Sequence, residues 1–129
     1  MAEGIFKKLI RRKIFVQSAG VFDTLEIDGF TVKVCNEINV KLSKHRVRSL
    51  REMEREGGFI GSFDLIIPLT KESSDEACKY STYSSVMIED WIVNEPIKNE
   101  NDINQTLCSY RTTRDIIFEK IKKRFQSYF

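Results

Sequence analysis

The sequence has little of what metalloenzymes and membrane-spanning proteins usually contain. Its 129 residues include one histidine, one tryptophan, two prolines and three cysteines. The longest apolar run, residues 65–69, is much shorter than the roughly 20 residues that cross a bilayer as a helix. A lone histidine, His45, has no second imidazole with which to share a metal ion. We therefore expect neither a transmembrane segment nor a metal centre.

The cysteines are few and widely separated. Cys35, Cys78 and Cys108 are odd in number and follow no zinc-binding or disulfide spacing, which favours a reducing compartment. The first residues lack the continuous apolar stretch and small-residue cleavage site of a secretory signal. These features predict an intracellular protein that is not secreted.

Catalytic signatures are also missing. The sequence contains no Walker loop, no Gly-x-Gly-x-x-Gly, no Gly-x-Ser-x-Gly and no His-Glu-x-x-His. The glycine-rich residues 57–61 follow a predicted helix, whereas a phosphate-binding loop would follow a strand. Adjacent carboxylates such as Glu89 and Asp90 point apart in a strand or a helix, so they do not form an acid–base pair. We expect a protein that is not an enzyme, with no catalytic residue, no cofactor and no small-molecule substrate.

Charge is abundant and unevenly distributed. The net charge is +2, but residues 56–105 hold ten acidic and three basic residues, whereas the rest of the chain holds nine and eighteen. Such an asymmetry informs the choice of partner more than the fold.

The apolar pattern predicts a single α+β domain over residues 1–129, with a small, mostly antiparallel sheet and about three helices. Residues 1–13 form a basic amphipathic helix, because apolar pairs recur at helical spacing between cations. The C-terminal helix, from about Arg114 with Thr112 as a cap, is also basic. A third helix is expected from an N-cap at Ser43 to a stop at Gly57. The expected strands cover residues 14–16, 22–27, 30–42, 63–67 and 84–93, where 30–42 is either one long strand or two strands with a bend at Asn36.

Two of these assignments rest on local signals. Asp28-Gly29 is typical of a hairpin turn, and the alternation of apolar residues from Phe30 to Leu42 is typical of a strand. Residues 71–80 are polar and fit either a loop or a short helix that begins at Ser73 or Ser74.

The basic clusters are the candidate binding surfaces. The first 13 residues combine bulky apolar side chains with five cations, as in helices that lie on anionic bilayers. The same cations could neutralise phosphates of RNA. The predicted membrane-binding residues are Ile5, Phe6, Lys7, Lys8, Leu9, Arg11, Arg12 and Lys13. The predicted RNA- or lipid-binding residues are Arg46, Arg48, Arg51, Arg55, Lys122, Lys123 and Arg124.

Two stretches resemble viral proteins. "KIFVQSAGVFDTLEIDGFTVKVC" is similar to the start of bornavirus matrix proteins, and "GFTVKVCNEINVKLSKHRVRSLREMEREGGFIGSFDLII" is similar to the strand–helix–strand core of lyssavirus matrix proteins. The resemblance implies an α+β protein that self-associates, coats the inner face of a viral envelope and contacts ribonucleoprotein. The chain lacks the Pro-Pro-x-Tyr and Pro-Thr-Ala-Pro budding motifs.

The leading hypothesis is therefore a matrix-like viral structural protein of the host cytoplasm and virion, which binds anionic membrane and assembles with itself. One alternative is a nucleic-acid-binding accessory protein. Another is an interaction adaptor or host-factor antagonist that docks a basic partner through residues 89–102.

Overall fold

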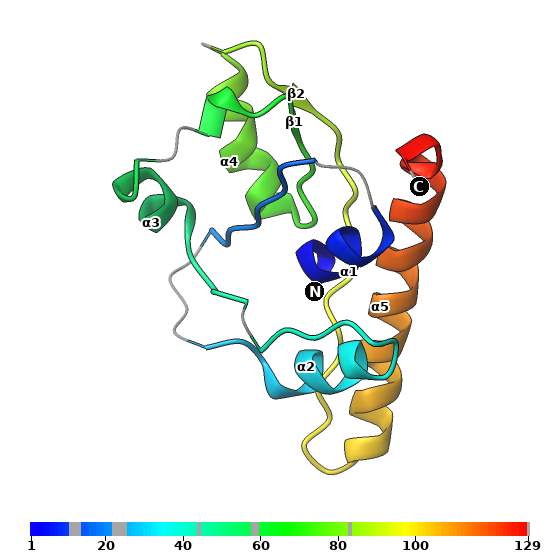
Figure 1. The fold of residues 1–129 in the computed structure, drawn as a ribbon. Coiled ribbons are helices and arrows are strands. Elements are labelled where there is room, and N and C mark those ends of the chain that lie inside the picture. Colours follow the sequence, from blue (N-terminus) through cyan, green and yellow to red (C-terminus); the bar gives the residue numbers. More distant parts are fainter. Residues whose placement is uncertain (11–13, 22–25, 44, 58–59, 83, 129) are drawn as a thin grey trace. The chain divides into compact units, whose positions relative to one another are not determined.

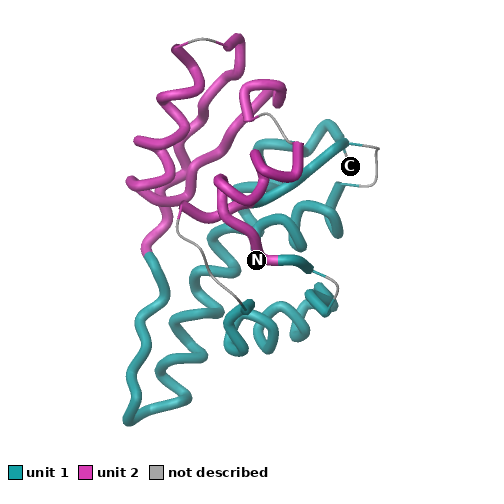
Figure 2. The backbone as a smooth tube through the Cα atoms, turned by 90° about the vertical axis from the view of Figure 1, so that its left-hand side faces the viewer, with its two compact units in different colours: residues 1–18, 26–46, 95–129 teal, residues 19–25, 47–94 magenta. Residues whose placement is uncertain are grey.

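The computed structural model describes residues 1–129 except 11–13, 22–25, 44, 58–59, 83 and 129. Its contacts divide the chain into two compact units, coloured separately in Figure 2. Unit 1 comprises Met1–Ser18, Glu26–Arg46 and Glu95–Phe129, and unit 2 comprises Ala19–Leu25 and Val47–Asn94. The single domain expected over residues 1–129 stays a prediction.

The described residues of unit 1 form three α-helices. These are α1 (Ala2–Leu9), α2 (Gly29–Asn36) and the 22-residue α5 (Ile103–Arg124). Both short helices pack against α5, which Figure 1 shows in orange beside the blue α1 and the cyan α2. A 3-10 turn, Gln126–Tyr128, follows α5.

The core of unit 1 joins residues from the two ends of the chain. Ile5 and Ile121 are almost completely buried, and the rings of Phe6 and Phe125 meet edge to face at 4.9 Å between centroids. A second cluster of Val34, Leu107 and Tyr110 is packed against Phe30 and Met1. Burial of such side chains is the main stabilising term available to a small helical unit. The list of buried apolar residues in unit 1 is completed by Ile10, Cys35, Val40, Leu42 and Ile117.

The position of α1 depends on a glycine. A Cβ atom at Gly4 would lie 2.6 Å from Leu42 Cδ2 and 2.9 Å from Val40 Cγ1, so only glycine permits this approach without displacing those side chains. One residue earlier, the Glu3 carboxylate accepts a hydrogen bond from Ser18 and lies 3.1 Å from His45 Nδ1. The segments around residues 18 and 45 are thereby connected to the first turn of α1.

Unit 2 contains α3 (Leu50–Arg55), a 3-10 turn (Ile60–Ser62), β1 (Leu65–Ile66), α4 (Lys71–Ser81) and β2 (Met87–Ile88). The two strands pair in parallel, with Leu65 opposite Met87 and Ile66 opposite Ile88. Backbone hydrogen bonds continue beyond them, from Trp91 N to Pro68 O and from Val93 N to Leu69 O.

Side-chain caps start most of the helices. The Asp28 carboxylate accepts from Phe30 N at the start of α2, and Asp102 accepts from Gln105 N at the start of α5. Ser49 with Glu52 on α3, and Thr70 with Ser73 on α4, form capping boxes. In contrast, α1 has no side-chain cap at Met1.

The strand and hairpin predicted at residues 28–42 are wrong. Asp28 caps a helix instead of opening a turn, and residues 29–36 are helical. The spacing of Phe30 and Val34 also fits a helix, because residues four apart lie on one face of a helix. The cap at Asp28 and the packing of this segment on α5 favour the helix over the strand.

Other boundaries also differ. The helix predicted from Ser43 begins only after the cap at Ser49, whereas its stop is confirmed by Gly57, which has a φ of +89°. Residues 71–80 are helical. The last helix begins at Ile103, capped by Asp102, so Thr112 lies inside it, where its hydroxyl donates to the Cys108 carbonyl.

The expected mixture of helices and strands is confirmed, but the expected sheet is not. Among the described residues, strands 65–66 and 87–88 form the one sheet, and it is parallel where an antiparallel sheet was predicted. Residues 14–16 are described and are not in a strand, and most of the predicted strand 22–27 lies outside the described residues. No helix in the described chain has the length and apolarity to cross a membrane.

Candidate functional site

A groove of about 570 Å³ lies in unit 1, which is within the usual size range of small-ligand sites. All of its lining residues come from the helices of unit 1 and from the extended segment that precedes α5. They are Met1, Asp28, Thr31, Glu95, Pro96, Lys98, Tyr110, Thr113 and Ile117.

Three of these residues form a polar network. The Tyr110 hydroxyl donates to the Asp28 carboxylate, and Lys98 Nζ lies 3.2 Å from Asp28 Oδ2. Burial opposes ionisation of Asp28, but the hydrogen bonds from Tyr110, Phe30 N and Lys98 outweigh it and lower the pKa of this carboxyl. The hydrogen bond to Asp28 raises the pKa of Lys98. Asp28 and Lys98 therefore both stay charged and form an ion pair in the groove.

Burial, followed by the hydrogen bond to Asp28, raises the pKa of Tyr110. Its phenol consequently stays protonated and acts as a donor to Asp28. Because Asp28 also caps α2, one carboxylate connects the start of α2, the middle of α5 and the segment before α5.

The segment before α5 is attached to that helix by side chains of α5. Ile97 N donates to Ser109 Oγ at 2.7 Å, and Asn99 N donates to Thr106 Oγ1 at 2.8 Å. These bonds place Glu95, Pro96 and Lys98 along the groove. The Glu95 side chain is exposed, and none of the described residues forms an ion pair with it.

The beginning of α1 also lies at the groove, because Met1 is one of the lining residues. Ile5 N is the first amide to bond within the helix, to Met1 O, and no side chain caps the amides before it. Uncapped amides at a helix start carry partial positive charge and favour anions.

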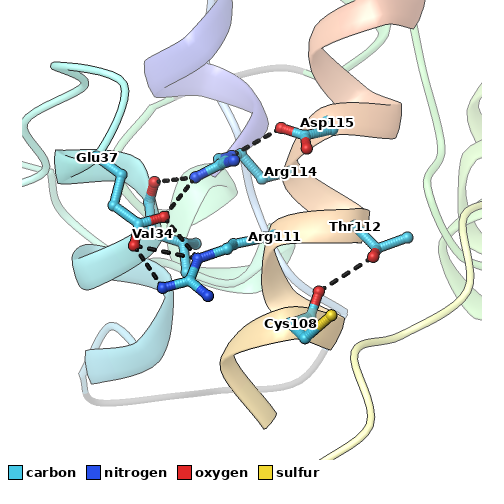
Figure 3. A network of polar contacts seen from close by, with 7 residues as sticks. All are labelled: Val34, Glu37, Cys108, Arg111, Thr112, Arg114 and Asp115. Atoms are coloured by element: carbon cyan, nitrogen blue, oxygen red, sulfur yellow. Dashed lines mark hydrogen bonds and ion pairs between the residues drawn. The ribbon is translucent and has the colours of Figure 1, made fainter. Parts of the chain in front are cut away.

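A second network holds α2 against α5, the two helices that supply four of the lining residues. Figure 3 shows Glu37 between Arg111 and Arg114, with Arg114 also reaching the Val34 carbonyl at 2.9 Å and Asp115 at 2.9 Å. The closest contacts to Glu37 are 2.7 Å from each arginine. The hydrogen bonds from Arg111, followed by those from Arg114, lower the pKa of Glu37 to about 2 despite partial desolvation.

None of the three cysteines is among the groove-lining residues. Cys35 is fully buried on α2, and burial raises the pKa of its thiol, so its thiolate is disfavoured. Cys78 on α4 and Cys108 on α5 are exposed free thiols. Among the described residues, no group of three or more histidine, cysteine or acidic side chains is placed to hold a metal ion.

The predicted membrane-binding residues separate into core and surface. Ile5 and Phe6 are buried in the core of unit 1, and Leu9 is partly buried. Lys7 and Lys8 are exposed, Lys7 beside Glu3 at 3.2 Å and Lys8 donating to Asn39 O. Arg11, Arg12 and Lys13 lie outside the described residues.

The predicted RNA- or lipid-binding residues are divided between the units. Arg46, Lys122, Lys123 and Arg124 belong to unit 1, and Arg48, Arg51 and Arg55 belong to unit 2. Arg48 pairs with Glu56 at 3.5 Å. Within unit 1, the contact of Phe6 with Phe125 brings the cations at the ends of α1 and α5 to one end of the helix pair.

The groove residues were missed by sequence reasoning. Asp28 and Tyr110 are 82 positions apart, and neither stands in a recognisable motif. One local feature indicates the groove: Glu95, Pro96 and Lys98 form a short polar segment of mixed charge before a helix. The sequence analysis places this segment in an acidic region that docks a basic partner.

The family model for low molecular weight phosphotyrosine protein phosphatase matches residues 1–128. No match was found among curated proteins or among solved structures.

This match overturns the resemblance to viral matrix proteins, which rested on two short stretches without a chemical motif. The expectations that depended on it are wrong as well: a structural role in coating membranes, self-assembly, contact with ribonucleoprotein, and location in a virion. Its two alternatives, a nucleic-acid-binding accessory protein and an adaptor, are replaced for the same reason. The expected lack of enzymatic activity and of a small-molecule substrate is corrected too, because the family is one of phosphatases.

Proposed function

Because the chain belongs to the low molecular weight phosphotyrosine protein phosphatase family, we propose that it hydrolyses phosphotyrosine, with the phosphate ester bound in the groove of unit 1. The family match over residues 1–128 is the observation that carries this proposal. The groove supports it, because its volume of about 570 Å³ accommodates an aromatic phosphate and its lining combines apolar, cationic and acidic groups.

The phosphate binds beside Lys98, the basic side chain of the groove lining. Lys98 supplies a full positive charge, and Asp28, 3.2 Å away, keeps it protonated. The uncapped amides at the start of α1 add the partial charge of a helix N-terminus, a common environment for phosphate groups. Pro96, Ile117 and Tyr110 provide surface for the aromatic ring.

Glu95 is the acid for the leaving group. In the net reaction water supplies the oxygen that ends on phosphorus, the bond from phosphorus to the phenolic oxygen breaks, and that oxygen takes up a proton. Glu95 in its protonated form donates this proton and is reprotonated from solvent. Asp28 does not take this role, because its hydrogen bonds keep it ionised. The described groove lining contains no thiol, so none of the three cysteines is assigned as a nucleophile.

One observation bears on where the protein works. Cys35, Cys78 and Cys108 are all free thiols, and free thiols are typical of a reducing compartment. An intracellular location is part of this proposal for that reason.

The test is release of inorganic phosphate from para-nitrophenyl phosphate and from a phosphotyrosine peptide. We expect turnover by the wild-type chain and a loss of about 100-fold in kcat for Glu95→Gln, the lower end of the range for removal of a positioned acid. Glu100→Gln, an exposed carboxylate in the same segment but outside the groove lining, is the matched control and keeps wild-type turnover. Wild-type turnover no faster than the buffer blank overturns the proposed activity. Equal rates for Glu95→Gln and wild type overturn the role of Glu95.

A further inference from the structure

The extended segment before α5 runs back along that helix, and Figure 1 shows it in yellow beside the orange α5. Ile97 N donates to Ser109 Oγ at 2.7 Å, and Asn99 N donates to Thr106 Oγ1 at 2.8 Å. Residue numbers rise along the segment where they fall along the helix, so the two run in opposite directions. Two hydroxyls of α5 thus hold the segment that carries Glu95.

The two hydrogen bonds differ in how much support they have. Thr106 is almost completely buried, its hydroxyl also donates to Asn99 O at 3.1 Å, and Asn99 Nδ2 donates to Gln105 Oε1 at 2.6 Å. Asn99 is therefore attached to α5 at several points. The side chain of Ile97, by contrast, is 73% exposed, so burial contributes little to its placement and the bond from its amide to Ser109 contributes most.

Glu95 takes its position from the same bond. Pro96 has no amide hydrogen, and in the described part of the chain no hydrogen bond holds Glu95 or Pro96. Within unit 1, the Ile97 amide is consequently the fixed point closest to Glu95. The ring of Pro96 fixes its own φ and restricts the preceding residue to extended backbone. A displacement of Ile97 is therefore passed on to Glu95, because the backbone between them has little freedom to absorb it.

Building on the proposed function, we propose that Ser109 is a positioning residue, which holds the Ile97 amide so that the Glu95 carboxyl can protonate the departing phenolic oxygen. Ser109 is not among the groove-lining residues, so it acts through the segment and not on the substrate. The proton passes from the carboxyl to the phenolic oxygen as the bond from phosphorus to that oxygen breaks, which requires the two oxygens to lie within hydrogen-bonding distance. Loss of the Ser109 hydroxyl leaves the acid present but misplaced.

The test is the effect of Ser109→Ala on kcat for a phosphotyrosine peptide and for para-nitrophenyl phosphate. The phenol of tyrosine has a pKa of about 10, so its phenolate depends on the donated proton, whereas para-nitrophenolate is a weaker base and leaves with less help. We expect kcat to fall about tenfold for the peptide and less than about threefold for para-nitrophenyl phosphate. KM should change by less than about twofold, because Lys98 keeps its ion pair with Asp28.

Further variants locate the effect. Ser109→Thr retains a hydroxyl and should restore most of kcat. Added to Glu95→Gln, the Ser109→Ala substitution should change kcat by less than about twofold, because no acid is left to misplace. Thr112→Val is the matched control, since the Thr112 hydroxyl also lies on α5 but donates to the Cys108 carbonyl of its own helix, and its loss should leave kcat unchanged. Circular dichroism checks that each variant is folded.

A measurement without turnover tests the placement itself. The NMR signals of the Ile97 amide and of the Glu95 carboxyl are expected to move in Ser109→Ala and to stay in place in Thr112→Val. Movement of the Glu95 signal supports the placement, and a Glu95 signal that does not move overturns it.

The kinetic outcomes separate this inference from the proposed function. Hydrolysis of the peptide by wild type and Ser109→Ala with equal kcat overturns the inference and leaves the phosphatase proposal intact. Equal losses on the two substrates, or the same loss in the Glu95→Gln background, overturn the positioning of the acid and leave Ser109 a structural role. Absence of turnover by wild type overturns hydrolysis, and the NMR signal of Glu95 then decides whether Ser109 places that carboxyl.

Discussion

The two units differ in how they are held together. In unit 1 both α1 and α2 pack against the 22-residue α5, and the buried side chains, such as Ile5, Val34 and Ile121, come from all three helices. In unit 2 the strands are two residues long, and Ala77 is the buried residue of α4. Other buried apolar residues of unit 2 are Met53, Ile60 and Val86, and side-chain caps start α3 and α4.

The difference shows why the candidate chemistry lies in unit 1. A binding groove needs side chains held in place by packed elements, and Asp28, Lys98 and Tyr110 extend from helices and a segment fixed by several independent contacts. Three measurements test this difference between the units, and they follow from the largest expected effect to the smallest.

The largest effect is expected for Ile5→Ala in α1. Removing a fully buried Ile side chain lowers the free energy of unfolding by about 3 kcal/mol, through lost burial and the cavity left beside α5. Chemical denaturation gives the change, and hydrogen exchange should show faster exchange of amides in α1 and α5. Ile97→Ala, where the side chain is 73% exposed, is the control and is expected to change stability by less than about 0.5 kcal/mol. An equal loss for both variants would show that unit 1 lacks the core described above.

A smaller effect is expected for Thr70→Ala in unit 2. The Thr70 hydroxyl accepts from Ser73 N at 3.1 Å at the start of α4, and loss of such a cap costs about 1 kcal/mol. Hydrogen exchange of the α4 amides is the measurement, because it reports on this helix alone. Thr82→Ala, the same substitution at the exposed far end of α4, should accelerate exchange less. Protection of α4 that is unchanged by Thr70→Ala would contradict a helix maintained by its cap.

The smallest effect is expected for the dependence of stability on pH through Glu37. Its pKa is lowered from 4.5 to about 2 in the folded chain, so its contribution to stability is complete above pH 4.5 and is lost as pH falls toward about 2. Glu37→Gln should remove this part of the acid sensitivity of unit 1. Denaturation midpoints at several pH values between these limits test it, with Glu119→Gln, an exposed carboxylate on α5, as the control. Parallel pH profiles for wild type and Glu37→Gln would exclude the contribution.

Local signals in the sequence predicted some elements and missed others for identifiable reasons. The basic helix near the N-terminus, the stop at Gly57 and the apolar strands around residues 65 and 88 were predictable, because each depends on neighbouring residues. The helix from Phe30 to Asn36 was not predictable, since its apolar spacing fits both a strand and a helix. Which of the two forms depends on packing against α5, more than 60 positions away.

The candidate site was even less accessible from the sequence. Its central hydrogen bond joins Asp28 to Tyr110, and each residue has an ordinary local explanation, as a turn residue and as a core aromatic. Only the pairing across 82 positions reveals a polar network. The basic residues near the N-terminus are evident from the sequence, but their spacing with Ile5 and Phe6 predicted a membrane-binding helix. Sequence spacing does not show that Ile5 and Phe6 are buried in the core.

The division of unit 1 along the chain has a consequence for biosynthesis. Residues 47–94 of unit 2 lie between the parts of unit 1, and α5 ends only at Arg124. As the chain emerges from the ribosome, α1 and α2 are made first but have no helix to pack on until α5 has been translated. Ile5, Phe6 and Val34 therefore stay exposed while the residues between α2 and α5 are made, and the nascent chain depends on α5 to shield them from aggregation.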